Sequence, residues 1–325
     1  MKGSSQVHQS RLAIVQFNRH LRFIVACALA FCWVGQTTTH AQSSSQPLIK
    51  LGKIEPKSIN ESSGATRAIN FKDAFWTHND SGGRNNLYLL SLSGKHLATC
   101  PIPGARNRDW ETLDGFVMDG KSYLLIGDVG DNLSKRTDCE LLLVEEPKFK
   151  LKKGTIINET LKPTIIPIRF KDGPHNCEAM AVDAEQETIY LFEIRYVDDT
   201  SGKLPGIYRA KFKTDGSAIT AERLSNYPIR NVTGMAIDET GTQLVVRNYL
   251  NAHLFRRKKN QTWDEVLSSP KPKVVFTPIQ SQSEAIFFTE DSQSVVITSE
   301  GNQPVIWQVK LPTESTKTPK KTEKK

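Results

Sequence analysis

Five copies of a short motif, separated by 50 to 67 residues, run along this chain of 325 residues. Each copy opens on Glu or Thr and continues into small and apolar residues; the copies begin at Glu61, Glu111, Glu178, Thr233 and Glu284. Short runs rich in β-branched and aromatic residues follow each copy, with Gly, Asp, Asn and Pro between them, as is typical of β-strands. The third copy is followed by three such runs, "TIYLFEIR", "GIYRAKFK" and "AERLSNYP". A repeated unit with four strands predicts the blade of an all-β propeller.

The last unit is one strand short. After "EAIFF", "SVVITSE" and "VIWQVKL" the chain enters a polar tail. The run "PLIKLGKIEP" (Pro47–Pro56) precedes the first motif and can pair beside "VIWQVKL", which covers two open edges. We therefore predict a five-bladed β-propeller over residues 47–312, closed by an N-terminal strand. A six-bladed ring is the alternative, with a further blade near "KKGTIINETLKP" in the longest interval. "TWDEVLSS" (Thr262–Ser269) predicts one helical turn.

The N-terminal 41 residues have the pattern of a signal peptide. A basic region ends at Arg22, an apolar run of 13 residues follows at Phe23–Gly35, and small residues precede the expected cleavage after Ala41. The apolar run is shorter than the roughly 20 residues that a membrane span needs, although an uncleaved anchor is the alternative. We predict a secreted or periplasmic protein without a membrane span after cleavage. Residues 42–46 read as a linker and residues 313–325 as a disordered basic tail.

The formal charge of +8 is concentrated at the two ends of the chain. Residues 1–41 carry four basic side chains and no acid, and residues 313–325 carry five Lys against two Glu, so the body is close to neutral. Phosphate binding needs a concentrated basic face, so this distribution argues against nucleic acid as a partner. The basic run at Phe255–Lys259 is read as a solvated hairpin tip. We expect a monomer.

Three cysteines follow the predicted signal peptide: Cys100, Cys139 and Cys177. Their spacing is wide, and no metal-type C-x-x-C pair occurs. One disulfide, for example Cys100–Cys139, fits an oxidising compartment. Three buried thiols that behave as small hydrophobes fit equally well.

The residues that open the five motifs form the first candidate site. In a propeller the first strand of each blade lines the central channel, so we expect these residues to converge at the channel mouth: Glu61, Glu111, Glu178, Thr233 and Glu284. Close carboxylates repel one another unless they bind a cation, share protons or pair with basic groups. Calcium fits better than magnesium, because it accepts many carboxylates in a roomy site. Ser62 replaces Glu61 if the register shifts by one, and a water-filled channel is the alternative to an ion.

A second ring of polar residues follows the second strand of each blade. Its members are His78, Asp80, Asp128, Asp131, Glu193, Arg195, Arg247, Asn248 and Glu300. Loop ends on a rigid ring commonly carry function. His78 is a candidate general base with Asp128 as its acid partner, and Arg195 and Arg247 are candidates to clamp an anionic substrate. The alternative is that these segments are tight turns in which Asp and Asn bond their own backbone.

The segments "THNDSGG", "IPGARNRDWETL", "GDVGDN" and "NCEAMAVD" resemble a family of secreted bacterial β-propeller proteins, most of them without an assigned function. More loosely, the arrangement is similar to calcium-dependent phosphotriesterase and lactonase-like propellers, which have six blades, and to calcium-activated nucleotidases, which have five. In the nucleotidases, Glu and hydroxyl residues that open the inner strands hold the ion. The resemblance therefore implies calcium ligands at Glu61 or Ser62, Glu111, Glu178, Thr233 and Glu284. It implies no catalytic residue.

Three functions fit these observations. The first is a secreted propeller with a structural axial cation, whose loop face binds a small molecule, a glycan or a protein. The second is a calcium-dependent hydrolase of phosphoesters, nucleotides or lactones, in which the cation polarises the substrate. The third is a glycosidase that uses mouth carboxylates such as Asp80, Asp128 and Glu193. We favour the first, because propellers are reusable scaffolds and the fold does not set the function.

Overall fold

The computed structural model describes residues 47–313. The predicted signal peptide, the linker at 42–46 and almost all of the basic tail lie outside the described residues. Within residues 47–313, no helix has both the length and the apolar character that a membrane crossing requires.

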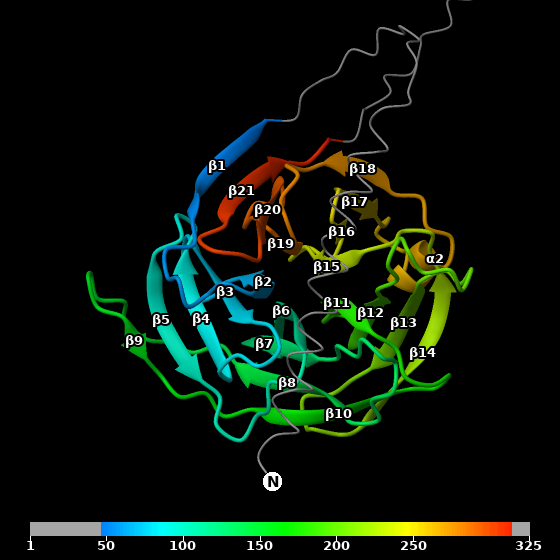
Figure 1. Ribbon diagram of the computed structural model, residues 1–325, viewed down its shortest axis with the longest axis horizontal. Helices are drawn as coiled ribbons and strands as arrows, with labels where there is room; N and C mark the ends of the chain where they lie inside the picture. The colour runs from blue at the N-terminus through cyan, green and yellow to red at the C-terminus, as the bar shows by residue number, and fades with distance from the viewer. Residues whose placement is uncertain (1–46, 314–325) are drawn as a thin grey trace, which may run out of the picture. The chain divides into compact units, whose positions relative to one another are not determined.

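Five strands lie innermost in the structure and pack against one another in a closed ring (Figure 1). They are β2 (Ser62–Arg67), β6 (Trp110–Met118), β11 (Cys177–Asp183), β15 (Val232–Ile237) and β19 (Ser283–Phe288). Each packs mainly against two others of the set, and β19 contacts β2 to close the circle. The predicted all-β propeller is confirmed by this arrangement.

From each inner strand the chain runs outward through antiparallel neighbours. The second strands are β3 (Ala74–Asn79), β7 (Lys121–Asp128), β12 (Thr188–Glu193), β16 (Gln243–Asn248) and β20 (Ser294–Ser299). The third strands are β4 (Asn86–Ser91), β8 (Cys139–Glu145), β13 (Gly206–Lys211), β17 (Asn251–Arg256) and β21 (Val305–Lys310). The outer strands are β5 (His96–Pro101), β10 (Thr164–Phe170), β14 (Ile219–Asn226), β18 (Lys273–Phe276) and β1 (Leu48–Lys53).

Strand pairing thus groups residues 47–313 into five units of four strands. Two of these units are joined, because β10 pairs in parallel with β14 and produces a sheet of eight strands. The segment that the six-bladed alternative would use supplies only β9 (Ile157–Asn158), which adds to β5 as a fifth strand of the first unit.

The N-terminal strand completes the last unit, as predicted. β1 pairs antiparallel with β21, and the register runs from Leu48 opposite Val309 to Lys53 opposite Val305. Gly52 lies within this strand, where a Cβ would be 2.1 Å from the Ser93 carbonyl oxygen. The strand therefore needs glycine at this point in order to pass the neighbouring turn.

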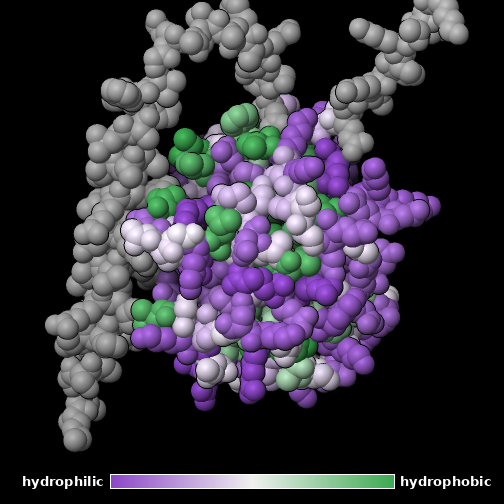
Figure 2. Space-filling model, turned by 90° about the vertical axis from the view of Figure 1, so that its right-hand side faces the viewer, coloured by the Kyte–Doolittle hydropathy of each residue, from purple (hydrophilic) through white to green (hydrophobic). Residues whose placement is uncertain are grey.

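Burial falls from the centre of the ring to its edge. Every residue of β11, β12, β19 and β20 is buried, whereas β14 alternates between buried and exposed positions. Inner strands are covered by sheets on both sides, which explains why even the small and polar residues of β2 and β11 are buried. The side view in Figure 2 shows a mostly hydrophilic surface with isolated hydrophobic residues, as outer strands with one solvated face should give.

The predicted helical turn is confirmed as α2 (Trp263–Ser268). Thr262 and Glu265 form a capping box at its N-terminus. Two of its own residues, Trp263 and Leu267, are buried. The basic run before α2 differs from the prediction in part. Lys258 and Lys259 are exposed, but the Arg257 guanidinium lies 2.7 Å from an Asp183 carboxylate oxygen and stacks on the Trp263 ring.

The three cysteines within residues 47–313 form no disulfide. Cys100, Cys139 and Cys177 are all free and buried. Cys100 packs in one hydrophobic cluster, while Cys139 and Cys177 pack together in another. The possible Cys100–Cys139 disulfide is therefore wrong, because the two residues pack in different hydrophobic clusters. The alternative prediction of three buried thiols is confirmed.

Candidate cation site at the channel mouth

Three of the predicted glutamates converge where the inner strands begin. Glu111, Glu178 and Glu284 are only 6–7% exposed. Burial raises the pKa of the Glu111 carboxyl well above its usual value, and the nearby carboxylates of Asp80 and Glu178 raise it further. Burial likewise raises the pKa of Glu178, and Glu284 adds to this effect. These carboxyls are close enough to oppose one another's ionisation, as convergence at one end of the channel requires.

The two remaining members of the predicted ring lie differently. Glu61 is half-buried, and its charge acts on Asp80 and on Glu300. The Thr233 hydroxyl donates to the Ser283 carbonyl oxygen at 2.6 Å, which ties two neighbouring inner strands together. Ser62, the alternative to Glu61, is fully buried.

The Ser62 hydroxyl shares a hydrogen bond of 2.7 Å with the hydroxyl of Thr77 on β3. This contact directs it into its own sheet, away from the inner strand of the neighbouring unit. Its neighbour Ser63 does reach that strand, because its hydroxyl donates to a Glu111 carboxylate oxygen at 3.2 Å. If β2 were shifted by one residue along its neighbours, Ser62 would take the place of Ser63 beside Glu111.

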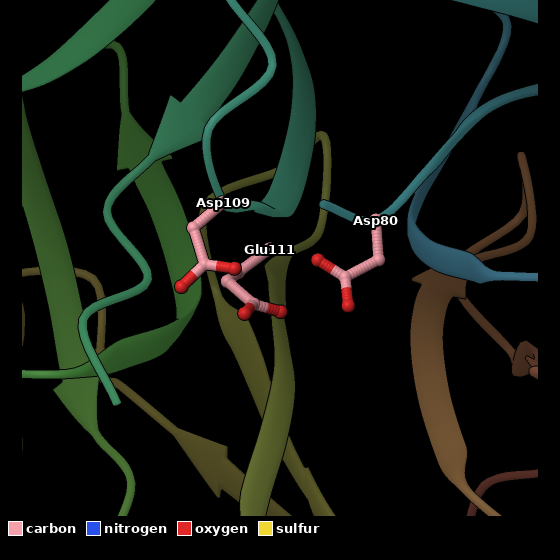
Figure 3. A group of neighbouring side chains, drawn as sticks. All are labelled: Asp80, Asp109 and Glu111. Carbon is pink, nitrogen blue, oxygen red and sulfur yellow. The ribbon is translucent and has the colours of Figure 1, made fainter. Parts of the chain in front are cut away.

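The tightest group of oxygen ligands is not the predicted ring. Asp80, Asp109 and Glu111 each offer a carboxylate oxygen, and these atoms lie within 4.8 Å of one another. Figure 3 shows the three side chains facing a common space, with Asp80 on one side and the other two opposite it. Two ligand atoms on one calcium ion, each about 2.4 Å from it, are at most about 4.8 Å apart. The spacing therefore suits a calcium-sized cation.

Electrostatics at this group favour a cation. Burial raises the pKa of Asp80 to about 7, and the neighbouring Asp109 carboxylate contributes to the shift. Burial also raises the pKa of Asp109 to about 6, although the Arg136 guanidinium opposes the rise. A bound divalent ion would relieve the repulsion between these carboxylates, which contributes to their raised pKa values.

Two loops bring Asp80 and Asp109 together. Asp80 directly follows β3, and Asp109 directly precedes β6. The Asn107 side-chain amide donates to the Asp80 carbonyl oxygen at 2.9 Å, and this hydrogen bond links the two loops. The Asp128 carboxylate accepts the Asp109 backbone N–H at 3.1 Å and the Arg136 guanidinium at 2.7 Å.

Through these hydrogen bonds, Asp128 holds the loop that carries Asp109 in place. It is fully buried, so the structure gives it a positioning role rather than contact with a substrate. Asp131 is similarly occupied. Its carboxylate accepts the Arg136 N–H, and its own N–H donates to Asn176 Oδ1 at 2.6 Å.

Glu300, from the second predicted ring, belongs to the same acidic wall, by which we mean the carboxylates of Asp80, Asp109, Glu111, Glu178, Glu284 and Glu300. Burial raises its pKa well above the usual value, and the Asp80, Glu61 and Glu178 carboxylates raise it further. The Gln282 side-chain amide donates to it at 2.7 Å.

Sequence reasoning missed several residues in or beside this wall. Asp109 stands two residues before Glu111 in the motif "DWETL", so a polar residue two places before the inner strand was the available signal. The Tyr196 hydroxyl donates to Glu178 at 3.2 Å, and the Asn176 amide donates to the same oxygen at 3.4 Å. Asn176 repeats that spacing before Glu178; no comparable signal marks Tyr196.

The predicted general base lies in the core. His78 is fully buried, its ring packs edge-on against Trp110 with centroids 5.7 Å apart, and its Nδ1 contacts the Asn79 carbonyl oxygen at 3.1 Å. Burial lowers its pKa to about 4, so the imidazole is neutral at pH 7. Its position beside Trp110 makes it part of the packing between the first two sheets.

The two predicted anion-binding arginines are already engaged. Arg247 is fully buried and donates to the carbonyl oxygens of Ala285 at 2.7 Å and Thr298 at 2.8 Å. Burial lowers its pKa to about 9. Arg195 pairs with Glu193 at 2.6 Å and with a second carboxylate, that of Asp199, at 3.2 Å.

Glu193 and Asn248 also have structural partners. The Glu193 carboxylate accepts the Gly206 N–H at 2.8 Å and contacts His175 Nδ1 at 3.2 Å. The Asn248 side-chain oxygen accepts the N–H groups of Leu250 and Asn251, which is the tight-turn geometry of the alternative interpretation.

No protein-family model matches the sequence, and no curated protein matches it significantly. Several solved structures are similar in fold. One is a gluconolactonase from Xanthomonas campestris, with 12% identity, a TM-score of 0.46, and coverage of 86% of this chain and 96% of that chain. Another is the Pan2 WD40 domain from Neurospora crassa, with 11% identity, a TM-score of 0.43, and coverage of 83% and 98%. A third, from a nidogen/laminin complex, has 12% identity, a TM-score of 0.39, and coverage of 73% and 72%. Similarity at this level does not bear on activity.

Proposed function

We propose that this protein is a secreted or periplasmic β-propeller that binds a divalent cation, calcium, at one mouth of its channel and uses the surrounding loops to bind a ligand. The observation that carries the proposal is the convergence of the Asp80, Asp109 and Glu111 carboxylates within 4.8 Å. Glu178, Glu284 and Glu300 supply further negative charge around them. Hard oxygen donors in this number favour calcium over softer metals.

The site has the support that a metal centre needs. The ligand-bearing loops are held by hydrogen bonds from Asn107 and to Asp128, so the carboxylates are positioned before an ion arrives. Preorganisation of this kind lowers the cost of binding. The backbone at Gly130 also lies close to the carboxylates of both Asp109 and Glu111.

One observation favours a hydrolase as the second candidate. Asp80 and Asp109 are half-buried rather than enclosed, so an ion between them would face solvent on one side. An open coordination position is what distinguishes a catalytic ion from a structural one. In that case the cation would polarise a phosphoester, nucleotide or lactone bound at the mouth.

Metal analysis and thermal unfolding of the full chain, with calcium and with chelator, test the proposal. We expect bound calcium and a higher melting temperature in its presence. The double variant Asp109→Asn, Glu111→Gln should abolish both. The control Glu222→Gln removes an exposed carboxylate on β14, far from the mouth, and should leave both unchanged.

Equal melting curves with and without calcium, and no bound metal, would refute the cation site. If calcium binds, hydrolysis assays with phosphoester, nucleotide and lactone substrates then separate the two candidates. Calcium-dependent turnover that is lost in the double variant favours the hydrolase, and its absence favours the binding protein.

A further inference from the structure

The opposite end of the channel holds a cavity of about 740 Å³. It is lined by the C-terminal halves of the five inner strands, whereas the carboxylates of the cation site lie at or before the N-terminal ends of those strands. The two sites therefore lie at opposite mouths. The volume falls in the range of roughly 300–1,000 Å³ that is usual for small-molecule sites.

A hydroxyl without a protein partner lines this cavity. Thr66 is only 4% exposed, and no residue from 47 to 313 forms a hydrogen bond with its hydroxyl. The hydroxyl oxygen is not among the fully enclosed polar atoms, so it is accessible from the cavity. Space beside it exists because residue 115 is glycine, where a Cβ would lie 3.0 Å from Thr66 Oγ1. The hydroxyl is therefore available to water or to a ligand.

A carboxylate lines the same cavity. Asp114 is 5% exposed, and its two oxygens accept the N–H groups of Val182 at 2.8 Å and Gly115 at 3.0 Å. Each carboxylate oxygen can accept more than one hydrogen bond, so both keep capacity for a donor in the cavity. Burial raises the pKa of Asp114 to about 7, although the two N–H bonds oppose the rise, and an ammonium group beside it would favour the charged form.

The rim adds negative charge. The cavity is lined by seven carboxylate residues and two arginines, a formal charge of −5. Both arginines are already paired, Arg67 with Glu239 at 2.8 Å and Arg257 with Asp183 at 2.7 Å. The field in the cavity therefore attracts cations and repels phosphates and carboxylates.

We propose that this second mouth binds an organic cation, an aliphatic amine with two or more ammonium groups. Asp114 accepts one ammonium group at the wall, and the Thr66 hydroxyl is a further hydrogen-bond acceptor in the same cavity. The rim carboxylates receive the second ammonium group, and the aliphatic carbons between them pack against the ring of Phe116, which lines the same cavity. The amine site does not depend on the cation site at the other mouth.

Calorimetric titration of the full chain with spermidine tests the inference, and the variant Asp109→Asn, Glu111→Gln is titrated in parallel to show whether the amine binds at the other mouth. Calcium is left out, because the acidic cavity would attract it as well. We expect saturable binding that Asp114→Asn weakens by about tenfold or more, because a charge-assisted contact is lost. Thr66→Val keeps the shape of the side chain and should weaken binding by about threefold to tenfold. Glu222→Gln, on the outer strand β14, serves as the control and should bind normally.

Three results would overturn the inference. The first is no saturable binding of spermidine. The second is binding that survives both Asp114→Asn and Thr66→Val but disappears in Asp109→Asn, Glu111→Gln, which would place the amine at the other mouth. The third is binding of the neutral polyol sorbitol in preference to spermidine, which would make the site a polyol site. Thermal unfolding shows whether each variant is folded. If Asp114→Asn does not fold, the effect of Thr66→Val on spermidine binding decides the outcome.

Discussion

The backbone of Gly130 lies against the Asp109 side chain so closely that a Cβ at residue 130 would be 2.5 Å from Asp109 Oδ2. The same Cβ would be 2.7 Å from Glu111 Oε1. One glycine in the loop after β7 thus permits two carboxylates of the candidate cation site to stand side by side. The conformation of this glycine is ordinary, so the requirement comes from space and not from backbone strain.

Gly130→Ala should therefore weaken calcium binding. The new methyl group must displace one or both carboxylates, an overpacking effect of about 1–3 kcal/mol, which corresponds to about fivefold to 150-fold in affinity. Calcium titration followed by calorimetry measures it. Gly104→Ala is the control. Residue 104 has open space around it, so the substitution affects stability through its positive φ of 82° but should leave calcium affinity unchanged.

Stability without metal should fall as the pH rises. Burial and neighbouring carboxylates raise the folded-state pKa of Asp80 to about 7, and burial raises that of Asp109 to about 6, both above the usual value for an aspartate. A carboxyl with a raised folded-state pKa contributes stability that is fully present below the unfolded value and is lost as the pH rises through the folded value. Chemical denaturation in chelator from about pH 4 to pH 8 measures this, and an increase in the free energy of unfolding over that range would contradict it.

Calcium affinity should change in the opposite direction. Protons compete with the ion for Asp80 and Asp109, so affinity is low near pH 5 and rises through pH 6 to 7 as these groups ionise more readily. Titrations at fixed ionic strength across this range provide the measurement. A pH-independent affinity would mean that the ion is held by other groups.

Arg247→Met should destabilise the fold by about 2–4 kcal/mol. The buried guanidinium satisfies the carbonyl oxygens of Ala285 and Thr298, and the substitution leaves both without that donor. Denaturant unfolding measures the loss. Arg84→Met is the matched control, because Arg84 is exposed and forms no ion pair with any residue from 47 to 313. A stable Arg247→Met variant that loses only ligand binding would restore the anion-clamp interpretation.

Removal of β1 should open the ring. Deletion of residues 1–53 exposes the edge of β21, with which Leu48 to Lys53 pair, and it should lower the free energy of unfolding by more than about 4 kcal/mol and promote aggregation. Deletion of residues 1–46 alone leaves β1 in place and serves as the control. Thermal unfolding and light scattering compare the two chains. Equal behaviour would show that closure through β1 contributes little.

The propeller, its closing strand and the convergence of Glu111, Glu178 and Glu284 could all be predicted from the amino-acid sequence. These features follow from a repeat period and from strand patterns, which are local properties that a chain carries wherever it folds. The same reasoning placed the metal ligands one per inner strand, because symmetry was the only guide available.

Three features become visible only in the folded chain: Asp109 lies beside Asp80, Arg247 is buried, and a cavity of about 740 Å³ lies at the far mouth. Asp80 and Asp109 meet because Asn107 bonds the backbone of the neighbouring loop and Asp128 holds the chain beneath it. Arg247 is buried because the carbonyl groups of β19 and β20 need a donor there. Such positions depend on hydrogen bonds between segments far apart in the chain, and no periodicity in the sequence encodes them.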